Sequence, residues 1–205
     1  MILYDDPISG NGYKIRLLLA LLGIPYQYVP VDILRGESRT AEFLAKNPNG
    51  RIPVLQLDDG TFLPESNAVL FYLSQGTAYW PGDKVEQAQV MQWLFFEQYS
   101  HEPNIATARF WLAIKGFDDT PFNRELLEQR HKAGNEALAV MDQHLSTRTF
   151  MVGERYSIAD IALYAYTHEA HEGGFDLFLY PHVQAWLDRV SGQPGHVTTE
   201  WIPSA

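Results

Sequence analysis

The sequence contains no cysteine, which excludes disulfide bonds, zinc–thiolate sites and a cysteine nucleophile in any redox compartment. Any thiol chemistry must therefore use a sulfur atom that a ligand supplies. Basic residues are also scarce, because 15 Lys and Arg stand against 25 Asp and Glu, for a formal charge of −10. Nucleic acids and anionic membranes require clustered Lys and Arg. We therefore expect neither a nucleic acid nor a membrane as a partner.

Long hydrophobic runs are missing as well. No apolar segment approaches the about 18 residues of a membrane span, and Asp5 and Asp6 end the first apolar stretch too early for a signal peptide. These absences predict a soluble, cytoplasmic protein. Apolar residues nevertheless form 46% of the 205-residue chain, which suffices for the core of one large domain or two small ones.

The first 76 residues alternate strand-like and helix-like segments. A strand is predicted over residues 2–5, and residues 15–22 carry apolar side chains at helical spacing before Gly23, a typical helix stop. Residues 26–31 are rich in aromatic and β-branched side chains and predict a strand parallel to the first. The next predicted elements are a helix over 40–46, a hairpin over 54–57 and 61–63, and a helix over 66–73. The order β-α-β-α-β-β-α predicts an α/β domain over residues 1–76.

A linker is predicted over residues 77–84, where Pro81 and Gly82 interrupt the periodic pattern. Residues 85–205 then predict an all-α domain, because every periodic segment after the linker has helical spacing. Ser157 can cap one of these helices, with Asp160 as its partner at the third helical position. The remaining helices are expected over residues 85–113, 123–145 and 183–190, followed by an irregular tail from Gln193.

Two polar motifs lie where the strands of the first domain should meet its helices. Residues 9–16 read Ser-Gly-Asn-Gly-Tyr-Lys-Ile-Arg and place Ser9 at a helix start, whose free N–H groups and dipole favour an anion. Residues 49–55 read Asn-Gly-Arg-Ile-Pro-Val-Leu, and Glu65 and Ser66 begin the next helix. Together the motifs predict a site for a small anionic peptide.

In this order and spacing, the motifs resemble the soluble, cytosolic-type glutathione S-transferase family, and the resemblance extends along nearly the whole chain. Residues 9–16 resemble the active-site turn of the serine- and threonine-type classes, with bacterial theta- and nu-like members as the nearest pattern. Ile52-Pro53 is similar to the family's cis-proline step and Glu65-Ser66 to its γ-glutamyl clamp, and residues 152–160 resemble the capping motif of its helical domain. The resemblance implies a thioredoxin-like domain, an all-helical domain that contributes an electrophile pocket, glutathione as co-substrate, and a two-fold homodimer.

The resemblance assigns Ser9 as the group that activates the glutathione thiol. A thiol with a pKa near 8.5 is only a few per cent thiolate at neutral pH. Ser9 can donate a hydrogen bond to sulfur, the helix dipole adds about 0.3–1 kcal/mol, and Asn11 is our candidate for a further donor. Lowering the pKa by about two units requires about 2.7 kcal/mol, which the three contributions together can supply. Taken without the family, Ser9 and Asn11 are ordinary helix-capping residues.

The same resemblance assigns five residues to glutathione binding: Arg51, Ile52, Pro53, Glu65 and Ser66. A cis peptide at Ile52-Pro53 would present the Ile52 backbone to the cysteinyl unit. Ser66 would take the γ-glutamyl carboxylate and Glu65 the ammonium group. Arg51 is a candidate cation for the glycyl carboxylate. The weaker candidates for this charge are Lys14, Arg35 and Arg39. The alternative interpretations are a trans proline at a strand start, a plain helix cap and a solvated arginine.

The electrophile pocket is expected on the long helix over residues 85–113, with Tyr99, Arg109 and Phe110 as candidate lining residues. Its ligand would be a small hydrophobic electrophile or a disulfide. Some classes of the family activate the thiol with a tyrosine, which makes Tyr4 and Tyr13 alternatives to Ser9. The tail from His196 would either cover the pocket or close the fold.

Other site types fail on spacing. His168 and His171 lie at i, i+3, rather than the i, i+4 of a zinc-binding helix, so we expect no metal. The stretch Gly10-Asn11-Gly12 lacks the third glycine of a dinucleotide loop, so we expect no nucleotide. The sequence therefore favours a glutathione transferase. Two alternatives remain open: a glutathione-dependent disulfide reductase or peroxidase of the nu type, and a non-catalytic binding or interaction module with this fold.

Overall fold

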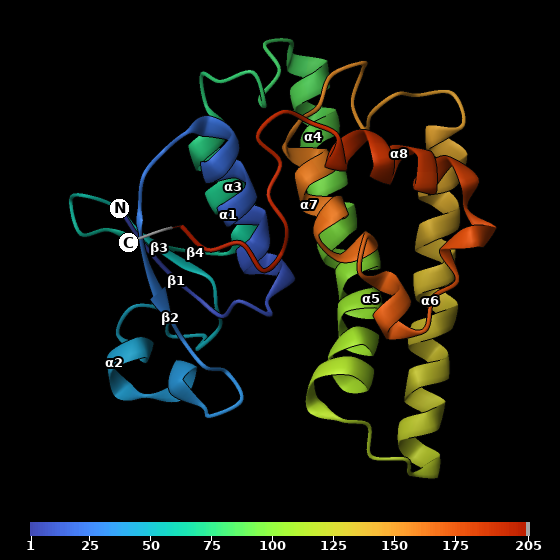
Figure 1. The fold of residues 1–205 in the computed structure, drawn as a ribbon, viewed down its shortest axis with the longest axis horizontal. Helices are drawn as coiled ribbons and strands as arrows, with labels where there is room; N and C mark the ends of the chain where they lie inside the picture. Colours follow the sequence, from blue (N-terminus) through green and yellow to red (C-terminus); the bar gives the residue numbers. More distant parts are fainter. Residues whose placement is uncertain (204–205) are drawn as a thin grey trace. The chain divides into compact units, whose positions relative to one another are not determined.

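The computed structural model describes residues 1–203 and divides the chain into two compact units (Figure 1). The first unit contains Met1–Thr77 together with residues 194–203, and the second contains Ala78–Gln193. The sequence placed the tail in the helical domain of residues 85–205, whereas the structure places it in the first unit. The physical cause is that Tyr13 and Arg16, two buried residues of the first helix, donate hydrogen bonds to backbone carbonyl groups of this tail. Ser204 and Ala205 lie outside the described residues.

The first unit is built on a four-stranded sheet with the order β2-β1-β3-β4. The strands are β1 (Ile2–Asp5), β2 (Gln27–Pro30), β3 (Val54–Gln56) and β4 (Phe62–Pro64). β2 runs parallel to β1, while β3 is antiparallel to both β1 and β4. The expected βαβ unit and hairpin are therefore confirmed, in the arrangement of a thioredoxin-like domain.

Three helices complete this unit: α1 (Gly10–Leu22), α2 (Ala41–Leu44) and α3 (Ser66–Ser74). Gly23 ends α1 as predicted, with a left-handed φ of 63° that glycine adopts at little cost. Thr40 begins α2, because its hydroxyl accepts the N–H of Phe43. Leu18 of α1 and Leu70 of α3 are fully buried, so both helices contribute to the core beside the sheet.

The register of the strands brings three chain segments to one edge of the sheet. Val54, the first residue of β3, pairs with Tyr4 near the end of β1 and with Pro64 at the end of β4. The chain that leaves β1 toward α1, the chain that enters β3 and the chain that leaves β4 toward α3 therefore meet at this edge. The N-termini of α1 and α3 lie at these exits, and helix N-termini favour negative charge.

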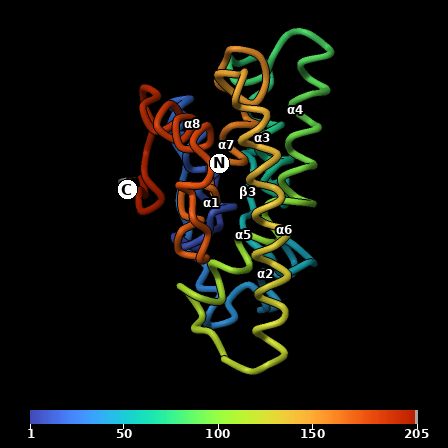
Figure 2. The backbone as a smooth tube through the Cα atoms, turned by 90° about the vertical axis from the view of Figure 1, so that its right-hand side faces the viewer, coloured from blue at the N-terminus to red at the C-terminus, as the bar shows by residue number. Residues whose placement is uncertain are grey.

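The second unit consists of five α-helices, two of which, α5 and α6, lie side by side in Figures 1 and 2. The helices are α4 (Lys84–Phe96), α5 (Glu102–Arg109), α6 (Pro121–Leu145), α7 (Ile158–Thr167) and α8 (Pro181–Ser191). The single helix expected over residues 85–113 is interrupted by π-helical segments at Glu97–His101 and Phe110–Lys115. Pro103 follows the first of them and has no N–H to continue the ladder of hydrogen bonds, which accounts for the change of register there.

The start of α7 is confirmed as a capping box. Ser157 caps the helix, and the Asp160 carboxylate accepts the backbone N–H of Ser157 at 2.9 Å. The same carboxylate accepts the N–H of Met151 at 2.8 Å and the indole N–H of Trp186 at 2.9 Å. Burial raises the pKa of Asp160 to about 6, against the lowering effect of these hydrogen bonds. One carboxylate therefore joins the preceding loop, α7 and α8.

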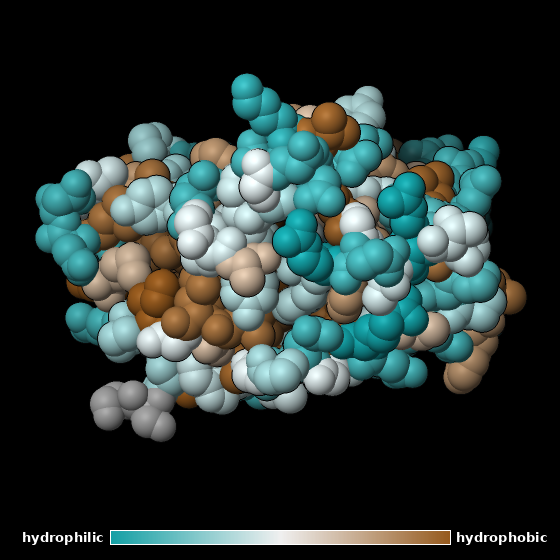
Figure 3. Space-filling model, turned by 90° about the horizontal axis from the view of Figure 1, so that it is seen from above, coloured by the Kyte–Doolittle hydropathy of each residue, from teal (hydrophilic) through white to brown (hydrophobic). Residues whose placement is uncertain are grey.

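Hydrophilic residues cover much of the face shown in Figure 3, with smaller hydrophobic groups between them, as the acidic composition leads one to expect. Within the described part of the chain, no helix combines the length and the apolar character that crossing a membrane requires.

Candidate functional site

Ser9 caps α1 at the edge of the sheet where the three segments meet. Its backbone is extended, and its Oγ accepts the N–H of Gly12 at 3.1 Å. Its own N–H donates to the backbone carbonyl oxygen of Asp6 at 2.9 Å, which closes the turn before the helix. Among residues 1–203, the Ser9 hydroxyl hydrogen has no acceptor. The hydroxyl is therefore placed to donate to a ligand atom at the helix N-terminus.

The Ile52-Pro53 peptide bond is cis, the conformation that the sequence led us to expect. Pro53 is buried, and Ile52 packs against a small core cluster that contains Phe43. The loop before it is held by Asn47, whose side-chain amide donates to the carbonyl oxygen of Arg51 at 2.7 Å. Since Pro53 directly precedes the start of β3, this step lies at the same sheet edge as the Ser9 turn.

Glu65 is the only non-glycine residue of the described chain with a positive φ, at 67°. Such a conformation costs on the order of 1–3 kcal/mol and persists where the surroundings impose it, often at functional sites. Here it turns the chain from the end of β4 directly into α3. Ser66, the first residue of that helix, is buried.

Lys14 joins the two helix starts. Its side chain is fully buried, and its Nζ donates to Asn11 Oδ1 at 2.7 Å. Ser66 Oγ lies 3.4 Å and Asn67 Oδ1 3.5 Å from the same nitrogen. Ser66 also donates to Asn11 Oδ1, at 3.0 Å. A buried ammonium group thus lies beside the start of α3, in a cluster of hydroxyl and amide groups.

This cluster changes the interpretation of two residues. The sequence ranked Lys14 as a weak candidate for the glycyl carboxylate, yet the structure places it next to Ser66, at the proposed γ-glutamyl end. Asn67 was missed. Asn11 directs its amide oxygen toward Lys14 and Ser66, so its Nδ2 is the group that would act as the expected donor. The signal in the sequence was the i, i+3 spacing of Asn11 and Lys14, which puts both side chains on one face of α1.

The arginines considered for the glycyl end lie on the surface. Arg51 has an exposed side chain. Arg35 forms an exposed ion pair with Asp32 at 3.3 Å, and Arg39 donates to the carbonyl oxygen of Asn49 at 2.9 Å. Both of these side chains therefore have local partners in the loops around α2.

The two tyrosines considered as alternatives to Ser9 bond elsewhere. The hydroxyl of Tyr4 donates to Gln56 Oε1 at 2.9 Å, across the sheet. The hydroxyl of Tyr13 donates to the carbonyl oxygen of Val197 at 2.7 Å, in the C-terminal segment. Both hydroxyl groups therefore donate to acceptors outside the turn that carries Ser9.

The three candidates for the electrophile pocket all lie in the second unit. Tyr99 is in the first π-helical segment and has 88% of its surface exposed. Arg109 ends α5, and its guanidinium is held by Glu169 at 3.0 Å and Glu172 at 2.7 Å. Phe110, the next residue, is half-buried. Arg109 therefore has a structural role between α5 and the segment after α7, whatever it contributes to a ligand.

A thioredoxin-like unit with an anion-favouring edge, followed in the chain by an all-helical unit, defines a class of glutathione-binding folds. Residues 8–75 match the family model for the glutathione S-transferase N-terminal domain, and residues 92–194 match the model for its C-terminal domain. The chain belongs to the glutathione S-transferase family.

Individual proteins show the same relationship. A glutathione S-transferase structure from Pseudomonas fluorescens Pf-5 is 55% identical to this chain. The match covers 97% of this chain and 98% of the Pseudomonas chain, with a TM-score of 0.94. A glutathione transferase structure from Burkholderia graminis, which has two glutathione molecules bound per subunit, is 28% identical to this chain. The match covers 95% of this chain and 84% of the Burkholderia chain, with a TM-score of 0.80. Elongation factor 1-gamma of Danio rerio is 36% identical over 94% of this chain, which spans 44% of that protein's length.

Proposed function

We propose that the protein is a glutathione transferase that holds the thiolate of glutathione at Ser9. The observation that carries this proposal is the Ser9 hydroxyl at the N-terminus of α1, whose hydrogen has no acceptor among residues 1–203. A thiolate at this position would receive that hydrogen bond and the positive end of the helix dipole. Both favour the anion over the neutral thiol, and so lower the pKa of the thiol.

The remaining contacts would orient the peptide along the sheet edge. The γ-glutamyl carboxylate would bind at the start of α3, near the Ser66 hydroxyl, with the buried Lys14 ammonium as its counter-charge. Glu65 would take the amino group, the Ile52 backbone would pair with the cysteinyl unit, and Arg51 would approach the glycyl carboxylate. The binding of glutathione by the Burkholderia graminis structure supports this choice of ligand.

The reaction would begin with loss of the thiol proton to solvent. The thiolate would then attack an electrophilic carbon, forming a carbon–sulfur bond while a leaving group departs with its electron pair. We propose a small hydrophobic electrophile bound near Tyr99, Arg109 and Phe110, and a cytoplasmic protein that acts as a two-fold dimer. Light scattering coupled to gel filtration would measure the oligomeric state.

The test combines glutathione titration by calorimetry with an aryl halide conjugation assay. We expect binding at or below millimolar glutathione, and Ser9→Ala should lower kcat while glutathione still binds. Ser191→Ala removes an exposed hydroxyl of α8 and serves as the control. Absence of binding at millimolar ligand would refute the family function for this chain, and an unchanged kcat in Ser9→Ala would refute the serine mechanism.

A second candidate is a glutathione-dependent disulfide reductase or peroxidase, favoured by the two glutathione molecules in the Burkholderia graminis structure. The bound thiolate would attack a disulfide, releasing one thiol and forming a mixed disulfide, and a second glutathione would then yield oxidised glutathione. Asn11→Ala should lower this activity more than conjugation if the amide acts on the sulfur. Equal losses would instead indicate that Asn11 acts through Ser66 and Lys14.

A non-catalytic role is the third candidate, because elongation factor 1-gamma, at 36% identity, is named for translation and not for a transferase. Glutathione binding without conjugation or reduction by the wild-type protein would favour it.

A further inference from the structure

Arg16 connects the Ser9 turn to the C-terminal segment. It lies on α1 two turns after Ser9, and its side chain is fully buried. Nη2 donates to the carbonyl oxygen of Pro7 at 3.0 Å and approaches that of Ser9 at 3.5 Å. Nη1 donates to the carbonyl oxygens of Thr199 at 2.5 Å and Trp201 at 3.1 Å. One guanidinium therefore holds the backbone of two segments that lie far apart in the sequence.

Asp5 supplies the counter-charge for this group. Its Oδ2 lies 3.2 Å from Arg16 Nε, and both side chains are fully buried. Burial raises the pKa of Asp5, whereas the adjacent positive charge of Arg16 lowers it and favours the charged carboxylate. Four backbone carbonyl oxygens face the Nη1 and Nη2 groups of the guanidinium, which stays protonated in proteins, and the Asp5 carboxyl group faces Nε as an ion-pair partner. A lysine at this position, with three donors, could not make the same set of contacts.

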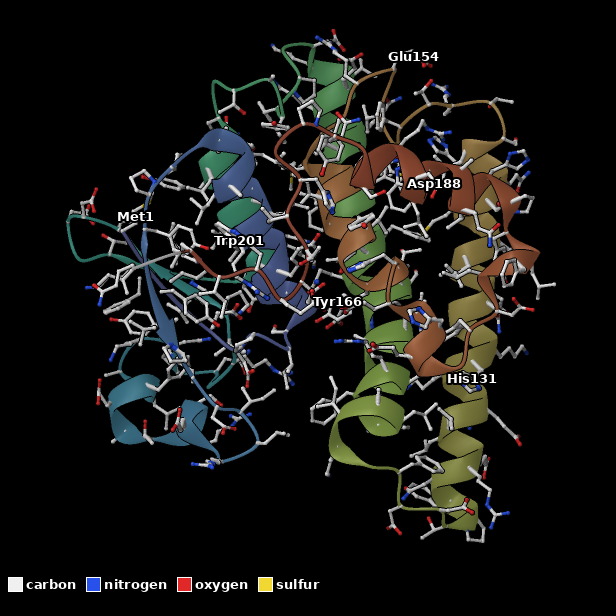
Figure 4. The ribbon with its side chains drawn as sticks, viewed as in Figure 1. Met1, His131, Glu154, Tyr166, Asp188 and Trp201 are labelled. Carbon is white, nitrogen blue, oxygen red and sulfur yellow. The ribbon has the colours of Figure 1, made fainter. Side chains whose placement is uncertain are left out.

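A second contact fixes the C-terminal segment to the same helix. Tyr13 is fully buried, and its hydroxyl donates to the carbonyl oxygen of Val197 at 2.7 Å and lies 3.2 Å from His196 Nε2. Residues 196–201 therefore lie along α1, as the red segment in Figure 1 shows, with Trp201 labelled beside that helix in Figure 4. The segment is irregular, and its attachment to α1 uses mainly its backbone carbonyl groups.

We propose that residues 196–201 act through Arg16 to position the Ser9 turn, and that Arg16 is a positioning residue for the thiolate site. The inference rests on the proposed function of Ser9. The segment occupies the Nη1 group of the guanidinium, and Nη2 is directed at the carbonyl oxygens of Pro7 and Ser9. Removal of the segment would admit water and free the side chain, and the turn would lose a fixed partner. A displacement of about 1 Å at a reacting group can lower the rate about a hundredfold.

The experiment compares two truncations, one after Gln193 and one after Pro203 as the control that keeps residues 196–201. The absorbance of bound thiolate, followed against pH, gives the pKa of the glutathione thiol on each protein. We expect truncation after Gln193 to raise this pKa toward that of free glutathione and to lower kcat about ten- to a hundredfold at neutral pH, with a smaller change in KM. Arg16→Lys should do the same, and the control truncation should match the full chain.

Folding is monitored by circular dichroism. A folded protein truncated after Gln193 with the full-length thiol pKa and kcat would overturn the proposal. If that truncation unfolds the chain, Tyr13→Phe decides, because it keeps the ring and removes only the hydroxyl contacts with the segment. A wild-type thiol pKa and kcat in Tyr13→Phe would then overturn the proposal equally.

A readout without ligand separates this inference from the proposed function. The N–H of Ser9 donates to Asp6, so its hydrogen exchange reports on the turn directly. Truncation after Gln193, or Tyr13→Phe if that truncation unfolds, should speed exchange at Ser9 relative to the control truncation. If exchange at Ser9 becomes faster but the wild-type protein does not bind glutathione, the positioning role is supported and the proposed function is refuted. If exchange is unchanged and the wild-type protein binds glutathione, the positioning role is refuted and the proposed function is supported.

Discussion

Lys14 and Asn11 lie one helical turn apart on α1, and the buried ammonium group of Lys14 donates to the amide oxygen of Asn11 at 2.7 Å. Asn11 accepts a second hydrogen bond from Ser66, at the start of α3. The amide therefore couples the turn that carries Ser9 to the helix that would bind the γ-glutamyl group. Through this pair, the start of α1 and the start of α3 share one hydrogen-bond network.

The first prediction concerns the charge of Lys14. Lys14→Met keeps the length of the side chain and removes the ammonium group, so a carboxylate at the start of α3 would lose its nearest buried cation. A charge-assisted hydrogen bond contributes about 1.5–3 kcal/mol, so the Kd for glutathione should rise about ten- to a hundredfold. Calorimetry measures it. Lys132→Met makes the same chemical change on an exposed part of α6 and should leave the Kd unchanged. An unaltered Kd in Lys14→Met would contradict the assignment.

The second prediction concerns the space beside Asp5. A Cβ at Gly12 would lie 1.7 Å from Asp5 Oδ1, which is far inside van der Waals contact. Alanine is the better helix former by about 0.5–1 kcal/mol, so helix propensity alone predicts that Gly12→Ala stabilises the protein. The structure predicts the opposite, a loss of about 1–3 kcal/mol in the free energy of unfolding. Urea denaturation of Gly12→Ala and the wild type shows whether the substitution raises or lowers the free energy of unfolding.

A double-mutant cycle identifies the cause of that loss. In an Asp5→Ala background, Gly12→Ala should lose most of its penalty, because the carboxylate that it would strike is gone. The same penalty in both backgrounds would show that the clash with Asp5 is not the reason.

The sequence was most informative where one short segment determines the structure. Gly23 ends α1 and Ser157 begins α7 through contacts within a few residues, so both were predictable. The place of Lys14 was not, because it depends on how α1 packs against α3, across more than fifty residues of chain. The same holds for residues 196–201, which have no periodicity and are held by their carbonyl oxygens. Backbone carbonyls are present in every residue and give no signal in the sequence.

The third prediction concerns Asp160, whose carboxylate accepts the N–H groups of Met151, Ser157 and Trp186. Asp160→Asn replaces one acceptor oxygen with a donor that must face another donor in a buried place. An unsatisfied buried group costs about 1–3 kcal/mol, and we expect a loss of at least that size in the free energy of unfolding. Asp188→Asn, an exposed change on α8, should stay within about 0.5 kcal/mol of wild type. Similar losses in the two variants would refute the role given to Asp160.

The last prediction is a pH dependence in the helical unit. The ring of His144 packs against Trp93 at 4.8 Å, and its Nε2 lies 3.0 Å from the carbonyl oxygen of Met151. Burial lowers the pKa of His144 below its ordinary value of 6.5. The folded protein thus binds this proton less tightly than the unfolded chain, so the stability that His144 contributes is complete above about pH 6.5 and is lost as the pH falls through the lowered pKa.

His144→Phe keeps an aromatic ring beside Trp93 and cannot be protonated. Its free energy of unfolding should therefore decrease less than that of the wild type when the pH falls from 7.5 to 5. The variant should thus be more stable relative to the wild type at pH 5 than at pH 7.5. Urea denaturation at several pH values gives both curves. His182→Gln removes an exposed histidine at the start of α8 and should keep the wild-type dependence on pH. If the free energies of unfolding of His144→Phe and the wild type depend on pH in the same way, His144 is not the source of the acid sensitivity. Only a residue whose proton affinity differs between the folded and unfolded states makes the free energy of unfolding depend on pH.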